Sequence, residues 1–213
     1  MNAKLLGFFS GFPTHLFTDE IAEVLREELP ERGWLVFISA WPQDHARNDE
    51  DRNGMHQMFA ERGMAFREHH VIDRRTGPAE AAELVRAADC VFLMGGDPVA
   101  QMALIRDLGL VSLLRDSPAV ILGVSAGAMN MGRHVAEIWE TKAFYEGLGL
   151  ADVTIKSHYT EGDWFVPLLK ELSREHPIVA MEDESAIFIQ ADGQRVLGPM
   201  VLFDKGEIGE VCR

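Results

Sequence analysis

Short apolar runs alternate with amphipathic segments along the chain as far as Ser125. The runs predict strands, and the segments between them predict helices because their apolar residues recur every three or four positions. The predicted strands are Leu5–Ser10, Trp34–Ala40, Phe66–Val71, Cys90–Met94 and Val120–Val124. The predicted helices are Leu16–Leu29 (with Thr18 or Asp19 as its cap), a segment near Met55–Arg62, Pro78–Ala87 and Val99–Leu108, and the polar stretch Pro42–Asn53 predicts a loop.

The predicted strands are apolar throughout rather than at alternate positions, and helices follow them. This pattern indicates a parallel sheet that is covered on both faces. Beyond Lys156, a helix near Trp164–Glu175 leads to short strands at Ile178–Met181, Ala186–Gln190, Val196–Gly198, Val201–Phe203 and Glu207–Val211, with tight turns at Asp192-Gly193 and Lys205-Gly206. We therefore predict a doubly wound, mostly parallel α/β sheet with helices on both faces and a C-terminal antiparallel extension, forming one domain over residues 1–213.

Charge and composition narrow the range of partners. The net charge of −14 argues against nucleic acid or an anionic membrane as a partner. The N-terminus carries one lysine and a brief apolar core before Pro13, so we interpret it as a strand rather than a signal sequence and expect a cytoplasmic protein. Cys90 in an apolar strand and Cys212 near the end form no disulfide framework, and Cys90 is expected to be an inert core thiol. The sequence is compatible with a single copy of the chain and with a homo-oligomer.

The stretch from Gly123 to Gly127 reads Gly-Val-Ser-Ala-Gly and follows directly on a predicted strand. In this context the G-x-S-x-G pattern is typical of a nucleophile turn, where a serine projects from a tight bend and its neighbours must be small. Ser125 is the candidate nucleophile, and the amide of Ala126 would point at the oxyanion that forms on attack. The alternative is that Ser125 only caps the helix that follows.

A second glycine turn, Gly95-Gly96-Asp97, follows the strand Cys90–Met94. Ligands bind at the carboxyl ends of strands in α/β sheets, so this turn is expected beside Ser125. Gly96 would let the backbone approach a substrate and offer a second oxyanion donor. A phosphate-binding loop is disfavoured because neither a Gly-Lys-Ser/Thr sequence nor the G-x-G-x-x-G spacing is present.

A serine nucleophile needs a base, and histidine suits neutral pH. His158 follows the predicted strand Val153–Lys156, whose end is expected at the same sheet edge as the two glycine turns. His134 is expected on the helix after Ser125, pointing away, and His69 and His70 at the end of an early strand. The remaining histidines are expected in loops or on polar helix faces: His15, His45, His56 and His176. The third group, which orients the histidine, has five candidates that the residues alone do not separate. They are Glu182, Asp183, Glu184, Glu137 and Glu140.

Five motifs together resemble the dipeptidase E and cyanophycinase family of serine peptidases, whose fold is similar to class I glutamine amidotransferases. They are Met94–Asp97, Gly123–Met129, Tyr145–Leu150, Ser157–Tyr159 and Asp183–Ile187. The resemblance implies Ser125 as nucleophile, His158 as base, Gly96 and Ala126 as oxyanion donors, and no metal or organic cofactor. It also implies Asp183 as the acid, three residues before the small residue Ala186, with Glu182 or Glu184 in its place if the register shifts by one.

Two departures from the family pattern stand out. Asp97 replaces the usual asparagine after the paired glycines. Members specific for N-terminal aspartate have a longer, arginine-bearing segment between the histidine and the acid, where this chain offers Lys170 and Arg174. We expect a serine peptidase acting on small peptides such as Asp-X dipeptides. The alternatives are a hydrolase of a non-peptide amide or ester and a non-catalytic binding module. Some aromatic residues are candidates for lining the substrate site, although such residues more often belong to the core: Trp41, Trp139, Trp164 and Phe165.

Overall fold

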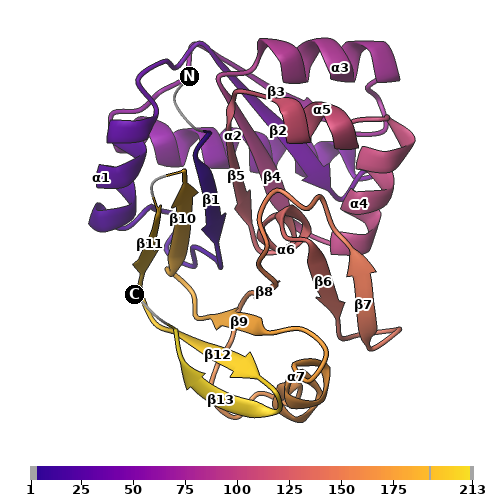
Figure 1. Ribbon diagram of the computed structural model, residues 1–213. Helices are drawn as coiled ribbons and strands as arrows, with labels where there is room; N and C mark the ends of the chain where they lie inside the picture. The colour runs from indigo at the N-terminus through magenta and orange to yellow at the C-terminus, as the bar shows by residue number, and fades with distance from the viewer. Residues whose placement is uncertain (1–3, 192, 212–213) are drawn as a thin grey trace.

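The computed structural model describes residues 4–191 and 193–211, and its largest sheet has seven strands in the order β11-β10-β1-β5-β4-β2-β3 (Figure 1). The strands from β1 to β3 in this order run parallel to one another. Their bounds are β1 Leu6–Phe9, β5 Val120–Val124, β4 Cys90–Gly96, β2 Trp34–Ala40 and β3 Glu68–Ile72. β10 (Ala186–Gln190) and β11 (Gly193–Leu197) add an antiparallel edge. The predicted fold class is confirmed.

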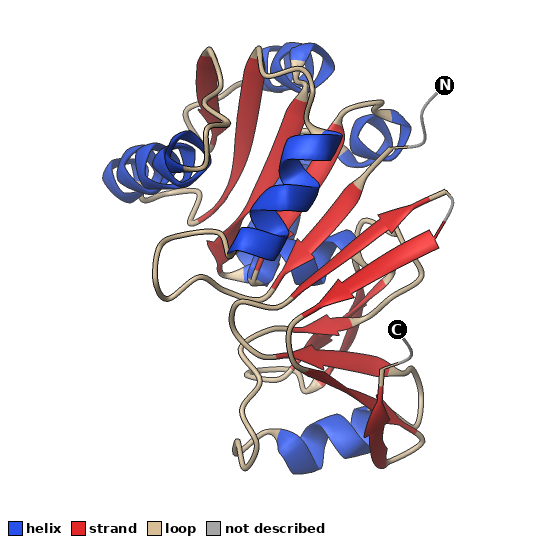
Figure 2. Ribbon diagram, turned by 90° about the vertical axis from the view of Figure 1, so that its left-hand side faces the viewer, coloured by secondary structure: helices blue, strands red, loops and turns tan. Residues whose placement is uncertain are grey.

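Helices cover both faces of this sheet (Figure 2). They are α1 Asp19–Glu28, α2 His45–Glu61, α3 Pro78–Ala87, α4 Pro98–Asp107, α5 Val111–Asp116 and α6 Ala126–Met131. The remaining helix, α7 Val166–Leu172, lies apart from this sheet. Leu35 and Phe37 of β2 pack with α1 and α2, whereas Val36 and Ile38 pack on the opposite face with α3 to α6. Because successive side chains of a strand point to opposite faces, burial on both faces requires the continuous apolar runs seen in the sequence.

A second sheet of four strands, in the order β13-β12-β9-β8, lies beyond the carboxyl edge of the first and packs on α7 (Figure 1). Its strands are β8 Ile155–Lys156, β9 Ile178–Met181, β12 Met200–Asp204 and β13 Glu207–Glu210. The predicted antiparallel extension is therefore divided, with β10 and β11 in the large sheet and the other strands in the small one. The chain changes sheet at Gly198, whose φ of 78° suits glycine, and Ser185 Oγ fixes this turn by donating to the carbonyl of Pro199 at 2.7 Å.

Several elements have the predicted bounds, including β2, α3, β5, β9 and β10, and the Lys205-Gly206 turn joins β12 to β13. The predicted loop Pro42–Asn53 is wrong, because α2 begins at His45 behind the Asp44 cap. This helix is polar on most of its surface, so it lacks the apolar periodicity that marks a helix. The short helix α5 and the hairpin of β6 (His134–Glu137) and β7 (Ala143–Glu146) were not predicted.

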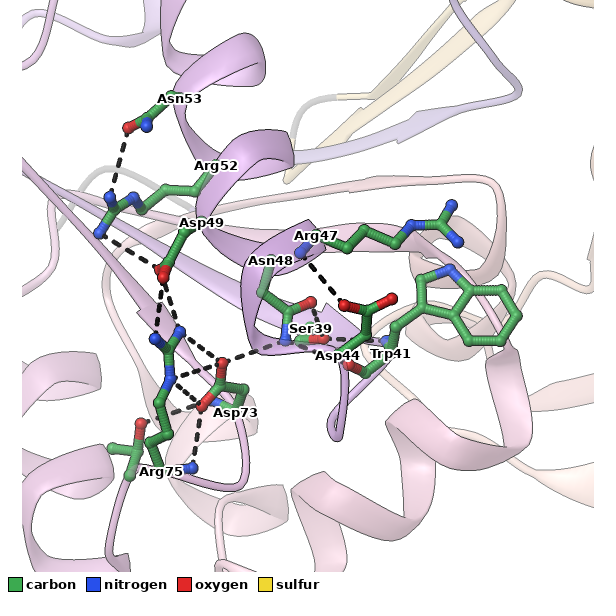
Figure 3. A network of polar contacts seen from close by, with 11 residues as sticks. Ser39, Trp41, Asp44, Arg47, Asn48, Asp49, Arg52, Asn53, Asp73 and Arg75 are labelled. Atoms are coloured by element: carbon green, nitrogen blue, oxygen red, sulfur yellow. Dashed lines mark hydrogen bonds and ion pairs between the residues drawn. The ribbon is translucent and has the colours of Figure 1, made fainter.

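A buried polar network at the end of β2 fixes the loop that carries Trp41 (Figure 3). The fully buried Asn48 of α2 donates to the carbonyl of Trp41 at 3.1 Å and to Asp73 at 3.0 Å. Its carbonyl oxygen accepts from the Ser39 hydroxyl at 2.6 Å. Because buried polar groups are costly unless paired, this network holds Trp41 at one place on the carboxyl edge of the sheet.

Cys90 is fully buried in β4, and burial raises the pKa of its thiol, so the group stays protonated at neutral pH. This agrees with an inert core residue. Two further expectations concern Cys212, as a cysteine outside any disulfide framework, and the tight turn at Asp192-Gly193. Cys212 and Asp192 lie outside the described residues. Among the helices that the structure describes, none has both the length and the apolar character needed to cross a membrane.

Candidate active site

Ser125 lies at the bend between β5 and α6, with φ 53° and ψ −115°, a backbone conformation that residues other than glycine seldom adopt. It is half-buried at the carboxyl edge of the large sheet. The glycines two residues before and after it have no room for side chains. A Cβ on Gly127 would lie 2.1 Å from the carbonyl oxygen of Leu93, and one on Gly123 would lie 2.7 Å from the carbonyl carbon of Gly127. Close packing of α6 on the sheet therefore requires both glycines.

His158 reaches Ser125 from the small sheet. Its Nε2 lies 2.8 Å from Ser125 Oγ, within hydrogen-bond distance. The expectation that its strand ends at the edge of the large sheet needs correction, because β8 pairs with β9 in the small sheet. His158 has a φ of 56°, and its backbone N–H donates to Ser10 Oγ at 2.8 Å. The histidine is thus held through its backbone as well as its ring.

Asp183 is the carboxylate that meets the histidine: its Oδ1 lies 2.7 Å from His158 Nδ1. The neighbouring acids do not share this contact. Glu184 accepts from the Thr14 hydroxyl at 3.0 Å, and Glu182 is held through its backbone N–H, which donates to the carbonyl of Pro199. Asp183 comes just before β10, and the antiparallel direction of β10 places the start of that strand at the carboxyl edge of β1.

The last residues of β1 and its extension hold all three segments in place. The carbonyl of Phe9 accepts from Ser125 N–H at 2.9 Å, and the carbonyl of Gly11 accepts from Glu184 N–H at 2.8 Å. Between them, the fully buried Ser10 accepts from His158 N–H and donates to the carbonyl of Met181 at 2.9 Å. Gly11 must be a glycine, since a Cβ there would lie 2.4 Å from Asp183 Oδ1.

The Gly95-Gly96-Asp97 turn lies beside Ser125, as expected of adjacent strand ends. A Cβ on Gly95 would lie 3.4 Å from the Cβ of Ser125. Gly96 has a φ of 140°, and a Cβ there would lie 2.3 Å from Trp41 Nε1, so the indole and the turn are in contact. The Asp97 carboxylate caps α4 by accepting from Val99 and Ala100 N–H groups at 2.8 and 3.0 Å. Its acidic side chain therefore supports the turn.

A cavity of about 320 Å³ opens onto Ser125. Polar groups and aromatic rings together line it: Gly96, Pro98, Ser125, Ala126, Met129, Trp139, Lys156, Ser157, His158 and Phe165. A larger and mainly apolar cavity of about 630 Å³ shares Gly96, Pro98 and Trp139 with it and also reaches Trp41. Of the aromatic candidates, Trp41, Trp139 and Phe165 line these two cavities, whereas Trp164 lines neither and is largely exposed.

Comparison with known proteins identifies the family of this chain. The model of peptidase family S51 matches residues 41–197 of the chain. The chain belongs to peptidase family S51. This S51 peptidase is a serine-type peptidase, and the family matches the dipeptidase E resemblance seen in its motifs. No curated protein matches the sequence significantly.

Solved structures share the fold of this S51 peptidase. A peptidase from an acI-B1 actinobacterium superposes with a TM-score of 0.75 at 17% identity, covering 99% of this chain and 98% of that one. A protein from Listeria monocytogenes EGD-e, assigned as a peptidase E, gives a TM-score of 0.69 at 19% identity and covers 91% of this chain and 98% of its own. The matched family region contains Ser125, His158 and Asp183 but begins after β1, so it omits Ser10 and Gly11.

The other candidate groups of this S51 peptidase have different partners. The Glu137 carboxylate accepts from three backbone N–H groups and the hydroxyl of the turn at residues 139–141. Burial opposes its ionisation, but these donors outweigh burial and lower the pKa of Glu137 to about 2. His134 begins β6 rather than lying on α6, and its ring stacks on that of His176 at 3.8 Å. Among the described residues, no group of three or more His, Cys, Asp or Glu side chains is arranged to hold a metal ion.

Sequence reasoning missed three residues of this site. Ser10 and Gly11 follow the first strand, so the rule that strand ends build sites in α/β sheets could have found them. Lys156 lies in the Ser125 cavity although it belongs to an otherwise apolar strand, and a charge in such a strand is itself an unusual signal. Lys170 and Arg174, the cations noted in the sequence, line neither cavity.

Replacing Ser10 with alanine should damage both stability and activity. The change leaves the partly buried N–H of His158 without its partner and removes one of two donors from the carbonyl of Met181, which keeps the N–H of Tyr159 at 2.9 Å. The free energy of unfolding should therefore fall by about 1–3 kcal/mol. Loss of the anchor should also displace the imidazole and lower the peptidase kcat/KM by roughly 10- to 100-fold. Denaturant unfolding and steady-state kinetics well below the melting temperature measure the two effects.

Ser117→Ala is the matched control, because this buried serine accepts from Ala119 N–H at 3.2 Å far from the cavities. It should lose stability with kcat/KM unchanged. If Ser10→Ala lost stability to the same degree and kept full kcat/KM, the anchor would have no role in positioning the histidine.

Proposed function

We propose that this S51 peptidase hydrolyses small peptides by acyl transfer, with Ser125 as nucleophile, His158 as general base and Asp183 as the acid that orients it. Asp-X dipeptides are the first substrate class to examine. One observation carries the proposal: Asp183 Oδ1, His158 and Ser125 Oγ form a hydrogen-bonded chain, with separations of 2.7 and 2.8 Å, that ends in a cavity.

Attack of Ser125 Oγ on the peptide carbonyl forms a tetrahedral intermediate while the hydroxyl proton passes to His158 Nε2. Asp183 accepts the hydrogen bond of Nδ1–H, so it selects the tautomer in which Nε2 is free to take the proton. The imidazolium that results is stabilised by the same carboxylate. His158 then gives the proton to the leaving amine, and the acyl group stays on Ser125.

The developing oxyanion needs hydrogen-bond donors, and the backbone N–H groups of Gly96 and Ala126 are proposed for this role. Both residues line the cavity beside Ser125. Ala126 is the first residue of α6, where N–H groups have no partner within the helix. The strained turn at Ser125 thus supports the hydroxyl and its neighbouring donor together.

Water completes the reaction by attacking the acyl-enzyme, with His158 again taking the proton. Water has access, since half of the His158 side chain is exposed. The size of the cavity favours a short substrate, because about 320 Å³ lies at the lower end of the range for small-molecule sites. Trp139 and Phe165 restrict the space around the reacting bond.

Replacing Ser125 with alanine should abolish hydrolysis, because it removes the hydroxyl that lies 2.8 Å from His158 Nε2. The expected loss of kcat is roughly 10⁴- to 10⁶-fold. Assays on a panel of dipeptides that includes Asp-X members measure it, and the melting temperature should stay close to that of the unchanged protein. A fluorophosphonate should add one covalent group to the wild-type protein, at Ser125, and none to the variant. Wild-type turnover in Ser125→Ala would reject the proposal.

A further inference from the structure

Lys156 is a buried cation in the wall of the Ser125 cavity. Lys156 is only 4% exposed, and it occupies the last position of β8, two residues before His158. The ammonium lies 4.4 Å from the ring centroid of Phe165 and 5.7 Å from that of Trp139, and both rings line the same cavity. Cation–π attraction therefore holds the charge at the cavity wall.

The ammonium lacks the partners that a buried charge normally has. It has three donors, and its hydrogen bond within the described part of the chain goes to the carbonyl of Ser157. No carboxylate oxygen of the described residues lies within 4.0 Å of it. Asp183, whose charge acts on Lys156, is already engaged by His158.

Lys4 gives a useful contrast. It too is partly buried, but it donates to the carbonyls of Leu114 and Arg115 at the C-terminal end of α5, at 2.6 and 3.4 Å. Carbonyls at a helix C-terminus stabilise a cation, so Lys4 has a structural explanation. Lys156 has no comparable set of partners, and its free donors lie beside the cavity.

Burial makes Lys156 costly to keep charged. Removal of the ammonium from water lowers the pKa of Lys156 to about 8, although the charges of Asp163 and Asp183 act in the opposite direction. A lysine whose folded-state pKa lies below its usual value destabilises the folded protein at neutral pH. An apolar residue would fill this place at lower cost, so a role in binding explains the lysine better than a role in stability.

We propose that Lys156 determines substrate specificity by binding a carboxylate of the substrate inside the Ser125 cavity. The inference rests on the proposed function, since it concerns the same cavity. Lys170 and Arg174, the cations that lie between His158 and Asp183 in the sequence, line neither cavity. Among the described residues that line the Ser125 cavity, Lys156 is the one lysine or arginine that can meet a carboxylate. The carboxylate has two sources in a short peptide, an acidic side chain before the scissile bond and the free C-terminus.

Binding to the Ser125→Ala protein tests the proposal without turnover. Calorimetric titration compares Asp-Ala-amide with Asn-Ala-amide for the side-chain carboxylate, and Ala-Ala with Ala-Ala-amide for the C-terminal one. In one of the two pairs the carboxylate compound should bind more tightly. Adding Lys156→Met should reduce that preference by about 10- to 150-fold, the range for a hydrogen bond to a charged group, while the neutral compound keeps its affinity.

The matched control is Lys170→Met, which removes a lysine of α7 outside the cavities and should preserve the preference. Lys156→Met should fold, since methionine fills similar space between the rings, and its melting temperature at neutral pH should not fall. The proposal is wrong if neither pair shows a preference, if the preference survives Lys156→Met, or if both members of a pair weaken equally. Failure of the wild-type protein to hydrolyse peptides is a separate result that rejects the proposed function alone.

The carboxylate preference should also depend on pH. Lys156 is charged below its pKa of about 8 and neutral above it, so the ratio of affinities within the pair should be constant in mildly acidic solution and fall as the pH rises through about 8. The charged groups whose fields reach Lys156 are Asp163, in the turn before α7, and Asp183, before β10. Titrations from about pH 6 to about pH 10 measure the ratio, which cancels effects common to both ligands. A ratio that does not change through pH 8 would contradict the assignment.

Discussion

Three consecutive residues at the end of β1 hold the whole site together. Phe9, Ser10 and Gly11 bind, in that order, the backbone N–H of Ser125, of His158 and of Glu184 next to Asp183. The three side chains come from segments far apart in the sequence, and a hydrogen-bonded contact between them tolerates displacements of only a few tenths of an ångström. A single buried strand end shared by all three segments provides that precision. The absence of a side chain on Gly11 leaves room for the Asp183–His158 pair above it.

Both sheets contribute residues to the site. The large sheet supplies Ser125 and the Gly96 turn on strands that are buried on both faces, which makes them rigid. The small sheet supplies Lys156 at the end of β8 and His158 two residues later, and Phe165 directly precedes α7. The Ser125 cavity is therefore lined from both sheets, with Gly96 of β4 from the large one and Lys156 of β8 from the small one. Ser10 directly follows β1 of the large sheet, and its hydroxyl bonds to Met181 of β9 and to the N–H of His158, so it links the base to the strand that holds Ser125.

Much of this arrangement could be predicted from the sequence, and the reasons for the misses are physical. Strands such as β2 and β5 were located because burial on both faces forces a continuous apolar run. The polar surface of α2 hides its periodicity, so its first turns were interpreted as a loop. The residues alone left five candidates for the acid, and the family resemblance selected Asp183. The antiparallel register of β10 on β1, in which Phe9 lies opposite Ala186, is what brings this carboxylate to His158. Composition does not encode such a register. Lys156 was not singled out, because the sequence does not show that the end of β8 lines the Ser125 cavity.

The most direct test of the proposed roles of Ser125, His158 and Asp183 is a crystal structure of the protein after reaction with an alkyl fluorophosphonate. The bound reagent mimics the tetrahedral intermediate. We expect phosphorus to be bonded to Ser125 Oγ, with the phosphoryl oxygen within about 3 Å of the N–H groups of Gly96 and Ala126. His158 should still be paired with Asp183. A reagent attached to another residue, or a phosphoryl oxygen directed away from both N–H groups, would contradict these assignments.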